Sequence, residues 1–152
     1  MALFKFIHLL AILIWVGGIF FAYIVLRPAT AEVLDMPQRL RLWAVVLRLF
    51  FNWVWGAVGV ILITGFYLIY LYGGITHVSR HVHTMLALGL AMMIIHGYMF
   101  FTGYVPFSLY VAKKRWQEAE DPLSKIRKLL AVNLAIGLLT VGVVLIGVVQ
   151  VA

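Results

Sequence analysis

The amino-acid sequence predicts an all-α integral membrane protein, an antiparallel bundle of four transmembrane helices with both termini on the extracytoplasmic side. Three observations predict this fold: the composition, four long stretches without charge, and the placement of the positive charges. Of the 152 residues, 65% are apolar and 11% are charged, and the mean hydropathy is +1.08. An ordinary soluble domain is about 45–50% apolar and about 25% charged, and a chain this small cannot hide the excess from water. The composition excludes a soluble enzyme, and the length allows a single transmembrane domain, residues 1–152.

Four stretches contain no Lys, Arg, Asp or Glu, and they cover residues 6–26, 49–79, 82–112 and 129–152. About 20 apolar residues in a helix cross about 30 Å of hydrocarbon, and in lipid only helices or closed barrels satisfy the backbone. The stretches lack the alternation of barrel strands. We therefore expect spans near residues 4–26, 50–73, 82–105 and 127–150.

Two prolines predict where helices begin. Pro37 opens a run that continues into the second span without a breaker, which predicts one long helix protruding into the cytoplasm. Asp121 followed by Pro122 has the pattern of an N-cap and a first helical residue, which predicts the start of the fourth helix.

The positive charges predict the orientation. Of the twelve Lys and Arg residues, ten lie in the first and third loops, and only Lys5 and Arg80 lie on the other side. Because cytoplasmic loops collect Lys and Arg, these two loops are expected in the cytoplasm and both termini outside. The same rule explains the net charge of +7 without a nucleic-acid partner. The lipid bilayer is the partner that the composition requires.

Histidines are the main candidates for function, and they are His8, His77, His81, His83 and His96. Ionisable residues inside membrane helices are rare and mark functional sites. The sequence has no cysteine, which excludes thiolate metal sites, iron–sulfur clusters and c-type haem. A metal would be held by His, Met, carboxylate or amide. His77, in the outer loop, is more simply explained as a solvated residue.

The first hypothesis is a b-type cytochrome. His8 and His83 are expected at one depth near the outer face, where two imidazoles on facing helices can ligate a haem iron from both sides. His96 lies about 20 Å deeper and about 140° around the helix from His83, which predicts a separate role. Trp15 would line the haem pocket or simply pack, and Arg80 would pair a haem propionate or be a loop charge. Electrons would pass between the quinone pool and a redox partner near the outer face, and any catalysis would be that of a haem-dependent membrane oxidoreductase.

The second hypothesis is copper binding or transport. One narrow stripe of the third span carries His81, Met85, Met92, His96 and Met99. Imidazole and thioether suit Cu(I), and the outer histidines, His77 included, would capture the ion. Methionines at helical spacing also serve as flexible packing, so both interpretations of the stripe stay open.

A third hypothesis is an accessory subunit that supports a larger membrane complex, with histidines used only for packing. The sequence shows no acid–base pair, nucleophile arrangement or phosphate loop. It leaves open whether the chain forms a homo-oligomer.

A family resemblance runs through most of the chain and is strongest in the first and third spans. The run from His8 through Trp15 and Gly18 to Arg27 resembles the first helix of CopD-type copper-resistance membrane domains. It is more distantly similar to HemJ-type protoporphyrinogen oxidases. Both families also share a third helix with two histidines 13 residues apart, as in the helix that starts near His83.

The resemblance implies a four-helix domain in the bacterial inner membrane and, for HemJ-type proteins, a b-type haem associated with the membrane histidines. By position this role would fall on His8, His83 and His96. HemJ-type proteins have a Lys two positions after the first histidine of the third helix, where this chain has Met85. The difference favours the resemblance to CopD-type domains over that to HemJ-type proteins. CopD-type domains are associated with copper handling, often as part of a larger membrane protein.

Overall fold

The regular structure is entirely helical. The computed structural model describes the backbone of residues 1–151 and the side chains of residues 1–147. In chain order the elements are α1 (Ala2–Phe20), the π-helical η1 (Phe21–Leu26), α2 (Arg27–Val33), α3 (Met36–Leu71), α4 (Arg80–Met99), the π-helical η2 (Phe100–Tyr104), α5 (Val105–Ala112) and α6 (Trp116–Val151). They join into four rods, α1–η1–α2, α3, α4–η2–α5 and α6, each long and apolar enough to cross a membrane. The predicted all-α fold with four spans is confirmed.

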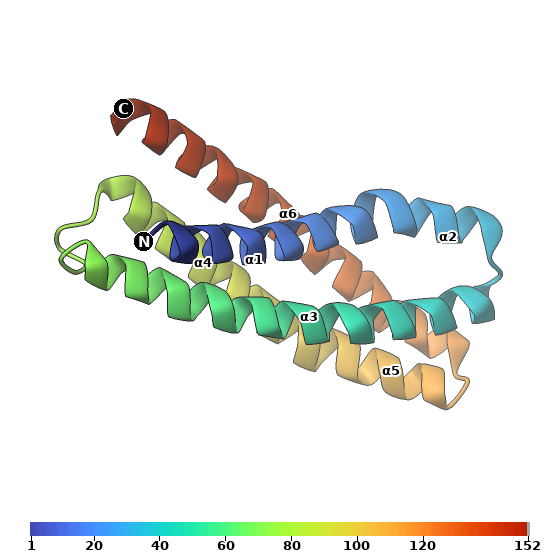
Figure 1. The fold of residues 1–152 in the computed structure, drawn as a ribbon. Helices are drawn as coiled ribbons and strands as arrows, with labels where there is room; N and C mark the ends of the chain where they lie inside the picture. Colours follow the sequence, from blue (N-terminus) through green and yellow to red (C-terminus); the bar gives the residue numbers. More distant parts are fainter. Residues whose placement is uncertain (152) are drawn as a thin grey trace.

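Successive rods run in opposite directions (Figure 1). One end of the bundle carries the start of α1, the α3–α4 loop and the later part of α6, and we call it the histidine end. The other carries the α2–α3 and α5–α6 connections, and we call it the arginine end. The most extensive packing is between α4 and α6 and between α1 and α3. Which end faces the cytoplasm stays a prediction from the charges.

The start of α3 follows the sequence prediction. The Asp35 carboxylate accepts a hydrogen bond from the backbone N–H of Gln38 at 2.9 Å, and Pro37 lies in the first turn. Such a cap satisfies an N–H that has no partner within the helix. From there α3 runs unbroken for 36 residues, about 54 Å at the usual helical rise.

The predicted start of the fourth helix at Pro122 is wrong, because α6 begins at Trp116 and contains Pro122. The turn before the proline is held by contacts of its own. The Arg115 guanidinium pairs with the Glu118 carboxylate at 2.8 Å, and the Ala119 N–H bonds the Arg115 carbonyl at 3.1 Å. These contacts form the first turn of α6 ahead of the proline.

Both π-helical segments end two residues before a proline, Pro28 in α2 and Pro106 in α5. A proline ring clashes with the carbonyl four residues earlier, and a local π-turn is one way to accommodate it. The first and third rods therefore continue as helices beyond the ends expected near residues 26 and 105.

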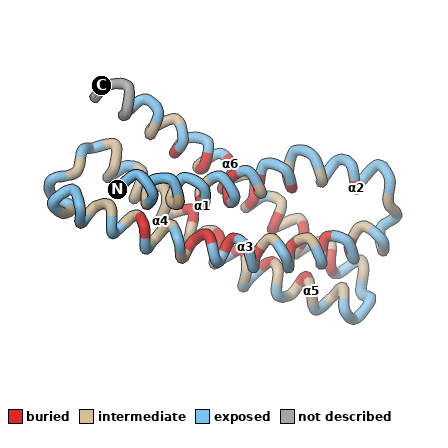
Figure 2. The backbone as a smooth tube through the Cα atoms, viewed as in Figure 1, coloured by how far each residue is buried: buried red, intermediate tan, exposed pale blue. Residues whose placement is uncertain are grey.

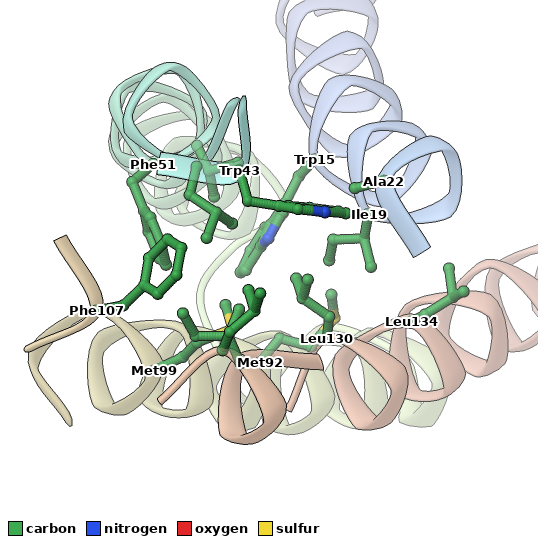
Figure 3. Close-up of a cluster of buried hydrophobic side chains, with 14 of the residues drawn as sticks. Trp15, Ile19, Ala22, Trp43, Phe51, Met92, Met99, Phe107, Leu130 and Leu134 are labelled. Carbon is green, nitrogen blue, oxygen red and sulfur yellow. The ribbon is translucent and has the colours of Figure 1, made fainter. Parts of the chain in front are cut away.

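The core lies in the middle of the bundle and towards the arginine end (Figure 2). Trp15, Trp43, Phe51 and Leu130 are almost fully buried, and Figure 3 shows these and neighbouring side chains of all four rods pointing at one another. The outer faces carry large apolar side chains, as a surface in contact with lipid tails requires. Fewer side chains are buried at the histidine end, and among the described residues α4 has no buried position before residue 92.

Candidate functional site

A cavity of about 200 Å³ lies between α1, α3, α4 and α6, in the half of the bundle nearer the histidine end. Most of its wall is aliphatic or aromatic, and within the described part of the chain no Lys, Arg, Asp or Glu lines it. The lining side chains that carry nitrogen, oxygen or sulfur are His8, Trp15, Tyr72, Met85, Met92, Met93 and Thr140. The cavity therefore presents one imidazole and three thioethers, beside two hydroxyls and an indole N–H, in an uncharged apolar wall.

The imidazole of His8 is oriented by a hydroxyl of the neighbouring helix. His8 Nδ1 lies 2.7 Å from Thr64 Oγ1, and this hydroxyl donates its single proton to the Val60 carbonyl at 2.6 Å. The hydroxyl must then accept from His8, which assigns the proton to Nδ1 and leaves the lone pair on Nε2. Gly65 leaves room for the ring, because a Cβ there would lie 3.2 Å from His8 Cε1. His8 is thus left with an unprotonated Nε2.

Three methionines of α4 face the same cavity. Met92 is 3% exposed, and Met85 and Met93 are half-buried. Met85 and Met92 are seven residues apart, two turns of one helix face. The structure therefore brings one imidazole of α1 and three thioethers of α4 to a single cavity.

The outer histidines lie outside the cavity wall. His83 is exposed, and its Nδ1 is 3.2 Å from the Ser79 carbonyl. His81 packs against α6, where a Cβ at Gly147 would be 2.6 Å from His81 Cγ. Among the described residues, no three His, Cys, Asp or Glu side chains are arranged to hold a metal.

The remaining outer candidates are also on the surface. His77 is exposed in the α3–α4 loop, with Nδ1 3.1 Å from Thr76 Oγ1. Arg80 is exposed at the first residue of α4.

His96 is fully buried in a ring of aromatic side chains. The ring centroids of Phe51, Trp55, Trp15 and Phe50 lie 4.9, 5.0, 5.7 and 6.2 Å from that of the imidazole. Among the described atoms neither imidazole nitrogen has a hydrogen-bond partner. Leaving such a group unpaired in an apolar interior costs about 1–3 kcal/mol, which marks His96 as a functional candidate.

His96 lies on the same face of α4 as Met92, which lines the cavity. Met92, one turn before His96, lines the cavity, and Met99, one turn after it, is completely buried. Trp15 both lines the cavity and contacts the His96 ring. One face of α4 thus carries Met92 at the cavity and then His96 and Met99 in the buried interior.

Two residues of the site were missed by the sequence analysis. Met93 lies beside the predicted methionine stripe, and adjacency to Met92 was the signal that could have found it. Thr64 is an isolated hydroxyl in an apolar span, and nothing in the sequence pairs it with His8, 56 residues away.

Four helical rods of this length and apolar composition define a multi-pass membrane protein. The family model described as copper resistance protein D, CopD, matches residues 44–146. This match spans more than half of the chain, which therefore belongs to the CopD family. It covers most of α3, the whole of α4, η2 and α5 and most of α6, and it leaves His8 outside. No curated protein and no solved structure matches the chain.

Proposed function

We propose that this CopD family protein binds Cu(I) within the membrane, at the cavity between α1, α3, α4 and α6, and passes it along α4. The observation that carries the proposal is the convergence of His8 with Met85, Met92 and Met93 on one cavity without a charged residue in its described wall. Family membership and donor chemistry point to the same metal.

The donor set suits Cu(I) better than harder cations. Thioether and imidazole are ligands of Cu(I), whereas carboxylate and water suit Mg²⁺, Ca²⁺ and Mn²⁺. The hydrogen bond from His8 Nδ1–H to Thr64 supports ligation through Nε2, because such outer contacts fix the tautomer of a metal-binding histidine.

A route for copper along α4 follows from the order of the donors. Met92 belongs to the cavity wall, His96 lies one turn further with both ring nitrogens unpaired in the described structure, and Met99 follows. We infer that an ion leaving the cavity passes from Met92 to His96. Trp15 and the other rings around His96 would exclude water from this step.

The haem hypothesis stays a prediction. Ligation by His8 and His83 requires both imidazoles at one pocket, and the exposed side chain of His83 gives that pairing no support. A pyridine haemochrome assay on the purified protein decides it. A stoichiometric haem b signal would favour the cytochrome, with a quinone or redox protein as partner, over the copper proposal.

The test of the copper proposal is competition with a chromophoric Cu(I) chelator, on purified protein under anaerobic reducing conditions. We expect His8→Ala and Met92→Leu to weaken binding by at least about tenfold, the usual range for loss of a metal-site contact. Met36→Leu, at the exposed start of α3, is the matched control and keeps wild-type affinity. Equal affinity in all variants would refute the proposed site. Absence of both copper and haem would favour the accessory-subunit hypothesis.

A further inference from the structure

Arginines from two rods meet one carboxylate at the arginine end. Glu120 of α6 pairs with Arg39 of α3, with Nη2 to Oε1 at 3.3 Å. Glu120 also pairs with Arg127, which lies seven residues later in α6. The distance from Arg127 Nη1 to Glu120 Oε2 is 3.9 Å. Each of the two arginine side chains is 22% exposed, so the group is partly shielded from solvent.

A third arginine adds positive charge to the same group. The positive charge of Arg27, at the start of α2, repels that of Arg127. The Arg27 guanidinium stacks on Tyr23 at 5.0 Å from the ring centroid. The cluster of Arg27, Arg39, Arg127 and Glu120 thus carries three positive charges and one negative charge.

The cluster is also short of acceptors. Within the described part of the chain, the Nε–H groups of Arg39 and Arg127 are covered by protein and have no hydrogen-bond partner. A covered N–H without an acceptor is destabilising, because it has lost its hydrogen bond to water and gained none in the protein. A bound anion toward which these side chains reorient would supply negative charge to balance the cluster and acceptor oxygens for its N–H groups.

The position of the cluster indicates the source of such an anion. It lies where α2 meets α3 and where α6 begins, at the end of the bundle to which ten of the twelve Lys and Arg residues belong. Lys and Arg residues at the ends of membrane helices are expected at the level of the lipid headgroups. The leaflet that attracts basic segments is the one rich in anionic lipids.

We propose that the arginine cluster is a binding site for the headgroup of an anionic phospholipid. Planar guanidinium groups match the oxygens of a phosphate and bind them through paired, charge-assisted hydrogen bonds. Arg27 and Arg127 provide the net attraction, while Glu120 holds Arg39 in place and opposes the phosphate by its own charge. The site is separate from the copper cavity and does not depend on it.

The experiment counts lipids retained by the full-length protein in native mass spectrometry, with phosphatidylglycerol, phosphatidylcholine and soluble glycerol phosphate as probes. We expect phosphatidylglycerol to bind in preference to phosphatidylcholine and Arg127→Gln to weaken this binding by about tenfold, the effect of one charge-assisted bond. Arg48→Gln removes an equal charge from an exposed position of α3 and leaves binding unchanged. Equal losses in both variants would show general electrostatic attraction and overturn the site.

Glu120→Gln separates a lipid site from a purely structural ion pair. It raises the charge of the cluster by one unit, so we expect tighter binding of phosphatidylglycerol together with lower thermal stability in phosphatidylcholine. A loss of stability without any gain in phosphatidylglycerol binding overturns the proposal. Binding of glycerol phosphate as tight as that of the lipid would also overturn it, in favour of a soluble phosphate ligand.

Discussion

At the scale of single residues, the tautomer of His8 depends on Thr64. The 2.7 Å contact between His8 Nδ1 and Thr64 Oγ1 crosses from α1 to α3 and determines which nitrogen keeps its lone pair. The sequence alone identified His8 as a candidate, because an imidazole inside an apolar span is unusual. It could not identify the hydroxyl, because that pairing depends on how two helices are rotated against each other.

Replacing Thr64 tests this contact. Thr64→Val has nearly the same shape and removes the acceptor, so we expect Cu(I) affinity to fall about tenfold with little change in helix content. Thr64→Ser keeps the hydroxyl and should retain most of the affinity. The measurement is chelator competition together with circular dichroism. Unchanged affinity in Thr64→Val, beside a loss in His8→Ala, would contradict the orienting role.

At the scale of helices, close packing determines where the cavity lies. Between membrane helices the hydrophobic effect gives little attraction, so packing of small residues and van der Waals contact decide the interfaces. Gly137 of α6 is such a contact, since a Cβ there would lie 2.9 Å from Val16 of α1 and 3.2 Å from Met92 of α4. α1, α4 and α6 meet at this glycine, which is also part of the cavity wall.

Gly137→Ala should therefore destabilise the bundle. The added methyl group must displace Val16 or Met92, and such overpacking costs about 1–3 kcal/mol. Gly142→Ala is the matched control on the same helix, where a Cβ would meet no atom within 4 Å in the described structure. There alanine should be neutral or stabilising through its helix propensity. Thermal unfolding in one detergent measures both, and equal shifts for the two variants would contradict the packing argument.

At the scale of the whole molecule, the charges are separated between the two ends of the bundle. The basic connections lie at the arginine end, and the start of α1 and the α3–α4 loop lie at the other. Because Lys and Arg are retained in the cytoplasm during insertion, the arginine end is predicted to be cytoplasmic. Copper would then reach the cavity from the extracytoplasmic half of the membrane.

Reporter insertion tests this orientation. Alkaline phosphatase placed after Gly74, in the α3–α4 loop, should be active because it reaches the extracytoplasmic side. The same enzyme placed after Lys114, in the α5–α6 connection, should be inactive, and a cytoplasmic reporter at that position should be active. The reversed pattern would invert the topology and move the expected entry of copper to the cytoplasmic side.

The sequence by itself determined the four spans, the start of α3 near Pro37 and the histidine and methionine candidates of α4. These are local properties, because apolar length, a proline at a helix start and helical spacing can be read from neighbouring residues. Only the tertiary structure decided that His8 faces Thr64 and shares a cavity with Met93, while His83 points to the surface. The reason is that lipid is as apolar as the core, so hydrophobicity does not show which face of each helix turns inward. That rotation is decided by contacts such as those of Gly137, which exist only once the helices have packed.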